Sequence, residues 1–74
     1  MFEKIKEIIV NYVEVNPDEI TENSRFIDDI GLNSYDFMCM LGDIEEEFNI
    51  TVDEAEIVNL RTVGEAIAYF ESLQ

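Results

Sequence analysis

The sequence contains no histidine and only one cysteine, and these absences remove most catalytic and metal-binding arrangements. Without histidine there is no serine–histidine relay and no histidine metal ligand. Cys39 alone cannot form an internal disulfide, and it is a poor candidate for a zinc ligand or a nucleophile. An ordinary small apolar residue is the simpler interpretation of Cys39. A single cysteine also fits a reducing compartment, so we expect a cytoplasmic protein.

Basic residues are also scarce, with four Lys and Arg against eighteen Asp and Glu, which gives a formal net charge of −14. A chain this acidic does not bind nucleic acid or an anionic membrane by charge. No apolar run is long enough to span a bilayer and the first residues lack a signal-peptide pattern, so we expect no membrane insertion. The acids around Asp28 do not alternate as in a calcium loop. We therefore expect no metal site, no catalytic residues and no enzyme activity.

The acids that are present lie mostly in the middle of the chain. No Lys or Arg occurs between Phe26 and Leu60, whereas this segment holds Asp28, Asp29, Asp36, Asp43, Glu45, Glu46, Glu47, Asp53, Glu54 and Glu56. Such a field attracts partner proteins with basic docking patches. With 47% hydrophobic residues the chain is apolar enough to fold, which argues against a disordered acidic tail.

The first part of the chain predicts one amphipathic helix followed by a long loop. Apolar residues recur at three- and four-residue steps over residues 2–13, and Pro17 is expected to end this helix. Asn16 before Pro17 indicates a cap and a possible single turn. Residues 20–32 show no clean period, and Ile20, Phe26, Ile27, Ile30 and Leu32 are expected to anchor a long loop there.

The second part predicts three more helices. A helix over 34–48 is capped by Asn33 and stopped by Asn49, and Gly42 inside it indicates close packing or contact with a partner. Residues 51–58 can form only a short helix, with Val52, Ile57 and Val58 as anchors. Thr62 and Glu65 form a capping box for a last helix with a core face of Val63, Ala66, Ile67, Phe70 and Leu73. We predict an all-α four-helix bundle, in one domain over 1–74, with a long loop between helices one and two and a short third helix.

Ser34 lies at the junction between the loop and the second predicted helix. If Asn33 is the cap, Ser34 is the first helical residue, and Asp36 can reach back to the Asn33 N–H. The hydroxyl of Ser34 then points outward beside a helix end that favours negative charge, so a phosphate ester is well placed there. By itself, however, a serine at a helix start is usually only part of the cap.

The residues around Ser34 resemble the attachment site of acyl carrier proteins. In that family an acidic–aliphatic–Gly segment precedes Asp-Ser-Leu, and residues 26–36 here are Phe-Ile-Asp-Asp-Ile-Gly-Leu-Asn-Ser-Tyr-Asp. The similarity continues through 44–48, 51–56 and 61–67, and thus covers essentially the whole chain. Asn33 and Tyr35 stand where the family usually has Asp and Leu, which favours a specialised carrier.

The resemblance implies that Ser34 carries 4′-phosphopantetheine, transferred from coenzyme A by a phosphopantetheinyl transferase. The arm would hold acyl groups as thioesters in fatty-acid, polyketide or specialised lipid biosynthesis, with the protein acting as a monomer. Partner enzymes would recognise residues at and after the attachment site: Asn33, Tyr35, Asp36, Met38, Cys39, Asp43, Glu45 and Glu46. Two alternatives stay open at this point, a carrier of aminoacyl or peptidyl units and an acidic interaction module without a prosthetic group.

Overall fold

The computed structural model describes residues 1–74, and all of its regular elements are helical. In chain order they are α1 (Phe2–Ile9), the 3-10 turn η1 (Pro17–Glu19), the wide helical turn η2 (Phe26–Ile30), α2 (Ser34–Phe48), α3 (Glu54–Ile57) and α4 (Val63–Ser72). The one β pairing is an isolated bridge between Arg25 and Thr62. The predicted all-α fold, with four α-helices of which the third is short, is confirmed.

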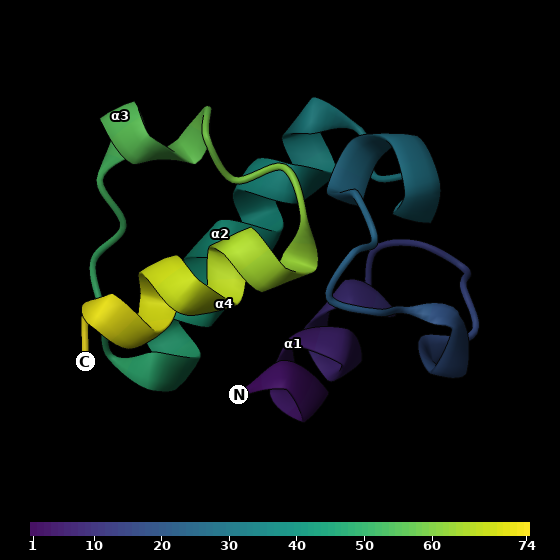
Figure 1. The fold of residues 1–74 in the computed structure, drawn as a ribbon, viewed down its shortest axis with the longest axis horizontal. Helices are drawn as coiled ribbons and strands as arrows, with labels where there is room; N and C mark the ends of the chain where they lie inside the picture. Colours follow the sequence, from purple (N-terminus) through teal and green to yellow (C-terminus); the bar gives the residue numbers. More distant parts are fainter.

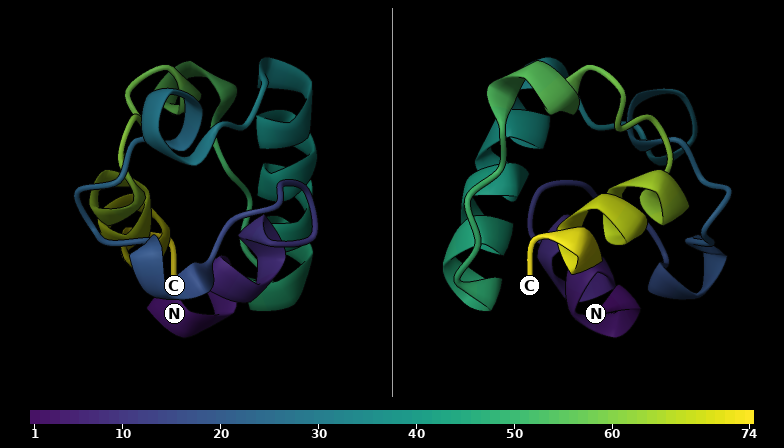
Figure 2. Two further views of the ribbon diagram at one scale, coloured as in Figure 1. Left: turned by 90° about the vertical axis from the view of Figure 1, so that its right-hand side faces the viewer. Right: turned by 60° about the vertical axis from the view of Figure 1, so that its left-hand side comes forward.

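The helices enclose one core, and the connection between α1 and α2 covers one end of it (Figure 1). The right-hand view of Figure 2 shows α2 as the long helix on one side, with α4 crossing the middle and α3 across the top. Both termini lie toward the same end of the molecule (Figures 1 and 2). All eighteen buried residues are hydrophobic, and no buried polar side chain lacks a hydrogen-bond partner. Burial of apolar surface is therefore the main force that holds the bundle together.

The first helix is shorter than predicted. It ends at Ile9, and the next residues form a tighter turn in which Asn11 N–H donates to the Ile8 carbonyl at 3.1 Å and Tyr12 N–H to the Ile9 carbonyl at 3.0 Å. Valine, asparagine and tyrosine are weak helix formers, and three such residues follow Ile9 in succession. The prediction that Pro17 ends the helix is therefore wrong, although the single turn at Pro17 is confirmed.

The long loop is not wholly irregular, because it contains η2. The Asp29 carboxylate accepts hydrogen bonds from the Arg25 backbone N–H at 2.8 Å and from the Arg25 guanidinium at 3.1 and 3.3 Å, and these bonds close the turn. Four of the predicted anchors are buried, namely Ile20, Phe26, Ile30 and Leu32. Ile27 is 48% exposed, so its predicted role as an anchor is wrong.

The second half of the chain follows the prediction closely. Helix α2 has the predicted bounds and ends at Asn49 in the left-handed conformation, with φ 54°. Helix α3 is capped by Asp53, and α4 begins with the full capping box of Thr62 and Glu65.

Two details of the second half were predicted wrongly, and one of the two roles predicted for Gly42 is excluded. Val58 is 74% exposed and Leu73 is 37% exposed, so neither belongs to the core. Val58 lies just after the four-residue α3, which is too short to bury two faces, and Leu73 follows the last turn of α4. Gly42 is exposed, and a Cβ there would meet nothing within 4 Å, so it does not mark close packing within the chain.

Candidate functional site

Ser34 is the first residue of α2, and its side chain is exposed. The Asn33 side-chain oxygen accepts from the Asp36 N–H at 2.7 Å, as the predicted cap requires, and the Asn33 carbonyl accepts from the Phe37 N–H at 2.9 Å. The reciprocal bond, in which the Asn33 N–H would donate to the Asp36 carboxylate, is not formed. The N–H groups of Ser34 and Tyr35 have no acceptor within the chain, so two donors at the positive end of the helix dipole face outward.

The loop before Ser34 fixes the position of the helix start. Gly31 has φ 94°, a left-handed conformation that favours glycine, and it ends η2. The next residue, Leu32, is 2% exposed, and its N–H donates to the Phe26 carbonyl at 3.0 Å. The chain is thus anchored on one side of Ser34 by a buried leucine and on the other by α2. This arrangement holds the serine at the surface on a rigid support.

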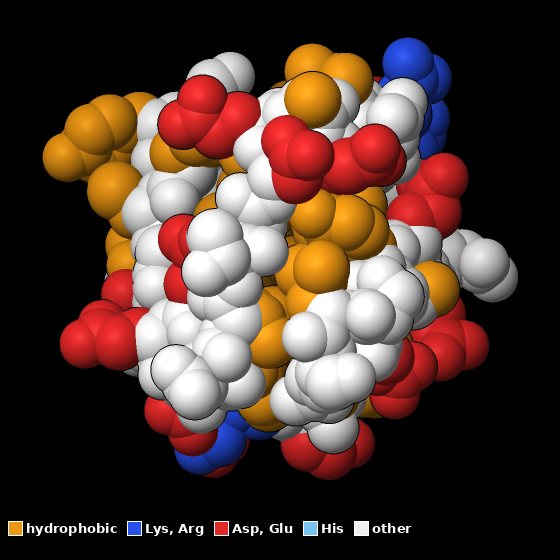
Figure 3. All heavy atoms as spheres, turned by 90° about the vertical axis from the view of Figure 1, so that its left-hand side faces the viewer, with side chains coloured by type: hydrophobic (Ala, Val, Ile, Leu, Met, Phe, Trp, Pro, Cys, Tyr) orange, Lys and Arg blue, Asp and Glu red, His pale blue; other side chains and the backbone are white.

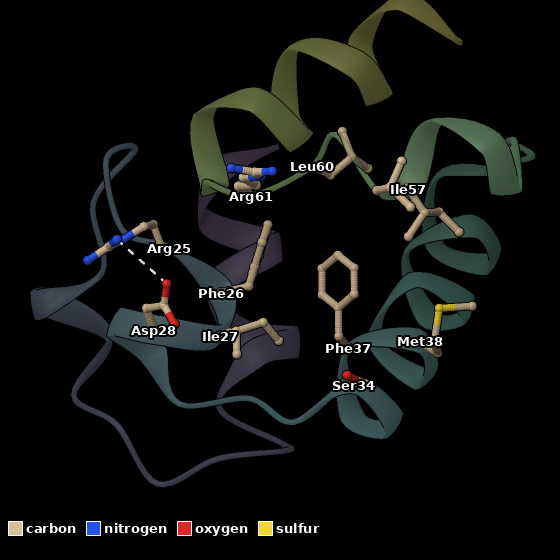
Figure 4. A pocket seen from close by; sticks show the side chains of 11 residues that line it. Arg25, Phe26, Ile27, Asp28, Ser34, Phe37, Met38, Ile57, Leu60 and Arg61 are labelled. Carbon is tan, nitrogen blue, oxygen red and sulfur yellow. Dashed lines mark ion pairs between the residues drawn. The ribbon is translucent and has the colours of Figure 1, made fainter.

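A groove of about 500 Å³ opens beside Ser34, between η2, α2 and the segment from α3 to α4 (Figure 4). Its lining consists of Arg25, Phe26, Ile27, Asp28, Ser34, Phe37, Met38, Ile57, Val58, Leu60 and Arg61. The rings of Phe26 and Phe37 pack together at the base, with centroids 5.1 Å apart and planes tilted by 49°. A groove of this size and character suits an apolar chain of small-molecule length.

The charged residues at the groove fall into a paired and an unpaired set. The Arg25 guanidinium forms ion pairs with Asp28 at 3.6 Å and with Asp29 at 3.1 Å. The hydrogen bonds between Arg25 and Asp29 hold the pKa of the Asp29 carboxyl below its usual range. The same bonds raise the pKa of the Arg25 guanidinium. The side chain of Arg61, by contrast, makes no hydrogen bond and no ion pair.

Sequence reasoning did not single out Arg25 or Arg61, although one signal marks them. They are the residues that border the segment without basic side chains. The Phe26 N–H donates to the Arg61 carbonyl at 3.0 Å, and the bridge from Arg25 to Thr62 continues this pairing. The two ends of the acidic segment therefore meet at the groove.

The residues predicted to contact partner proteins all come from α2 or its cap, but they differ in availability. Tyr35 is 76% exposed and Met38 48% exposed, and Asn33 and Glu46 are also exposed. Asp36 and Cys39 are half-buried. The first turns of α2 thus present apolar surface next to Ser34.

Two of the predicted recognition acids bind the chain itself. The Tyr12 hydroxyl donates a hydrogen bond to Asp43, and this bond raises the pKa of Tyr12 to about 12. The Glu45 carboxylate accepts from the Val52 N–H at 2.8 Å. No sequence signal pointed to these contacts, because Tyr12 lies 31 residues before Asp43 and Val52 lies beyond the helix end.

Among the charged side chains of the protein, acidic groups outnumber basic ones by eighteen to four. On the face seen in Figure 3, acidic groups surround a seam of hydrophobic side chains, and basic groups appear only at two edges. No three His, Cys, Asp or Glu side chains gather in an arrangement that could hold a metal ion. Every helix is too short or too polar to cross a bilayer.

Comparison with known proteins gives a consistent result. Residues 3–70 match the model of the phosphopantetheine attachment site family. The acyl carrier protein of Wolinella succinogenes is 38% identical over 72 residues, which are 97% of this chain and 95% of that protein. The acyl carrier protein of Thermotoga maritima is 37% identical over 71 residues, which are 96% and 88% of the two chains. The solved structure of the acyl carrier protein from Enterococcus faecalis superimposes with a TM-score of 0.84 at 26% identity, covering 99% of this chain and 92% of that one.

Proposed function

Because the chain belongs to the acyl carrier protein family, we propose that Ser34 is the residue to which its 4′-phosphopantetheine is attached. The family carries acyl intermediates as thioesters, typically in fatty-acid biosynthesis, and its members are carriers rather than catalysts. When attached, the group supplies a flexible arm that ends in the thiol on which an acyl group is held. A carrier of aminoacyl or peptidyl units stays a prediction, and no observation favours it. A module without a prosthetic group is not supported by the family match.

The observation that carries the proposal is the state of the Ser34 hydroxyl compared with the other two serines. The Ser24 hydroxyl accepts from the Thr21 N–H at 2.9 Å, and the Ser72 hydroxyl donates to the Tyr69 carbonyl. Ser34 alone has an exposed hydroxyl without a partner in the chain. It is therefore the serine whose oxygen is available to attack a phosphorus atom without breaking an existing contact.

The start of α2 also fits a phosphodiester. The unpartnered N–H groups of Ser34 and Tyr35 can donate to phosphate oxygens, and the helix dipole favours the negative charge. In the attachment step the Ser34 oxygen passes its proton to a base of the transferase and forms the new bond to phosphorus, while the bond from phosphorus to the adenosine bisphosphate portion of coenzyme A breaks and that portion leaves. The Asn33 cap keeps these donors directed outward during that step.

The groove next to Ser34 provides shelter for part of the acyl chain. Its apolar lining begins one turn after Ser34, with Phe37 and Met38, and extends to Leu60 on the opposite wall (Figure 4). Moving methylene groups from water onto this lining is favourable by roughly 25 cal/mol per Å² of apolar surface. A thioester held this way is partly shielded from water between encounters with enzymes.

The partners follow from the surface around Ser34. They are a phosphopantetheinyl transferase, which uses magnesium, and acyl-processing enzymes with basic docking patches. Tyr35 and Met38 supply exposed apolar contacts beside the serine, and Glu46 supplies an exposed charge farther along α2. Encounters driven by charge are fast and weak, as a shuttling carrier needs. We propose that residues 1–74 act as one monomeric carrier domain in the cytoplasm.

Intact mass spectrometry after incubation with coenzyme A, magnesium and a broad-specificity transferase tests the attachment. The wild-type protein should gain the mass of one phosphopantetheine, and Ser34→Ala should gain none. Ser24→Ala is the matched control, since it also removes one serine hydroxyl, and it should be modified like the wild type. Modification of Ser34→Ala would show that the site is wrong, and an unmodified wild type alongside a modified reference carrier would contradict the function.

A further inference from the structure

Arg61 is the one basic side chain of this protein without an acidic partner. The other three form ion pairs within 4.0 Å: Lys4 with Glu7 and Glu47, Lys6 with Glu3, and Arg25 with Asp28 and Asp29. Carboxylates outnumber basic groups by eighteen to four in this chain, so a guanidinium left without one is unexpected on charge alone. Its planar set of donors remains available for an anion from outside the chain.

Arg61 lies at the same groove as Ser34. The residue lines the apolar groove on the segment that leads into α4, whereas Ser34 lies on α2, and Figure 4 shows Phe26 and Phe37 between the two. The backbone at Arg61 is fixed, because its carbonyl accepts from the Phe26 N–H at 3.0 Å. A chain that enters the groove past Phe37 meets apolar surface first and the guanidinium at the far wall.

We propose that the groove takes acyl groups that bear a free carboxylate at the end opposite the thioester, and that Arg61 binds this carboxylate. The inference rests on the proposed function, because the acyl group reaches the groove from Ser34. Methylene groups of the cargo contact Phe37 and Leu60, and the terminal carboxylate pairs with the guanidinium, whose geometry matches two carboxylate oxygens. An acyl chain that ends in a methyl group gains the apolar contacts only.

The neighbouring charges do not cancel this preference. Asp28 also lines the groove, but its carboxylate is paired with Arg25, so its repulsion of an incoming anion is reduced. Arg25 in turn is occupied by two carboxylates and has less to offer a third. Arg61 is exposed, and ion pairs at exposed sites change an equilibrium constant by about twofold to fivefold. High salt weakens such pairs.

The test compares two cargoes of equal chain length, one ending in a methyl group and one in a carboxylate, each attached to the apo protein together with its phosphopantetheine arm. Each is loaded on Ser34 from the corresponding acyl-coenzyme A, and intact mass confirms loading before any comparison. Methyl resonances of Ile57 and Leu60 then report the ratio of molecules with the attached cargo in the groove to molecules with the attached cargo in solvent. We expect this ratio to be about twofold to fivefold higher for the carboxylate cargo, and the difference to shrink in 1 M salt.

Two variants separate Arg61 from a general effect of charge. Arg61→Gln should abolish the difference between the cargoes, while Lys4→Gln, which makes the same change in net charge outside the groove, should preserve it. Both cargoes carry the same phosphodiester, so binding of that phosphate by Arg61 would leave the two ratios equal. Equal ratios in the wild type, or a difference that survives Arg61→Gln, would overturn the inference. Failure to load Ser34 at all would instead contradict the proposed function.

Discussion

The first half of α2, residues 34–41, presents apolar side chains to solvent, whereas the second half, residues 42–48, bears acids that mostly bind the chain itself. Tyr35 and Met38 are the exposed apolar residues near Ser34. In the second half, Asp43 accepts from Tyr12, Glu45 accepts from the Val52 N–H, and Glu47 pairs with Lys4: three acids with three partners in the same molecule.

This difference changes how the acidic surface is understood. A count of carboxylates along α2 suggests a continuous docking strip, but only Glu46 in the second half is without a partner in the chain. The other acids connect α2 to α1, to the turn that follows α1 and to the segment after Asn49. We therefore expect contacts with partner enzymes to concentrate at the Ser34 end, whereas most acids at the far end of the helix bind the chain itself.

The largest expected change in stability comes from a comparison of a buried apolar residue in the second half of α2 with an exposed one in the first half. Ile44→Ala in the second half removes a side chain that is 0% exposed and should lower the free energy of unfolding by about 2–5 kcal/mol. Met38→Ala in the first half, where the side chain is 48% exposed, should change it by no more than about 0.5 kcal/mol. Urea unfolding followed by circular dichroism measures both, and losses of equal size would contradict the comparison.

The next effect separates two adjacent acids. Glu45→Ala removes the acceptor of the Val52 N–H and should cost about 1–3 kcal/mol of unfolding free energy. Glu46→Ala should cost less than about 0.5 kcal/mol and should instead weaken binding to a basic partner. Glu45→Gln serves as the control, because its amide oxygen can still accept the bond. If Glu46→Ala proves the more destabilising of the two, the assignment of fold-holding acids is wrong.

A smaller effect is expected at the helix start. Asn33→Ala removes the cap bond to the Asp36 N–H and should lower the free energy of unfolding by about 1 kcal/mol. Asn33→Asp replaces the accepting amide oxygen with a carboxylate oxygen in the same place and should be close to the wild type. Thermal unfolding of the three proteins at one ionic strength checks this, and an unaffected Asn33→Ala would mean that the cap does not stabilise α2.

The smallest effect depends on pH and concerns the bond between Tyr12 and Asp43. The pKa of Tyr12 in the folded protein is about 12, above the ordinary value of 10.0, because its hydroxyl donates to Asp43. Its contribution to stability is therefore complete below pH 10 and is lost as the pH rises toward 12. Tyr12→Phe should be less stable than the wild type at pH 8, and the gap should narrow above pH 11. A gap that stays constant over this range would rule out the bond as its source.

The parts of the fold that sequence predicted are those governed by neighbouring residues. Asn33 with Asp36, and Thr62 with Glu65, are separated by three positions, so caps and apolar periodicity located α2 and α4 correctly. The position of Ser34 at a helix start followed from the same local signals. Whether that serine is modified did not, and the family resemblance carried that step.

The parts that sequence missed depend on contacts between distant residues or on unusual geometry. The bond from Tyr12 to Asp43 and the meeting of Arg25 with Thr62 require the folded chain. The groove has the same origin, since its walls come from η2, α2 and the segment before α4. The turn η2 escaped because its five residues are too few to show a period.

Locating the prosthetic group by fragmentation mass spectrometry tests the central claim most directly. The chain has three serines, Ser24, Ser34 and Ser72, and peptides that contain each of them can be fragmented after incubation with coenzyme A and a transferase. Fragment ions should place one phosphopantetheine on Ser34 and leave the other two serines unmodified. A phosphopantetheine on Ser24 or Ser72, with Ser34 unmodified, would contradict the assignment of the start of α2 as the attachment site.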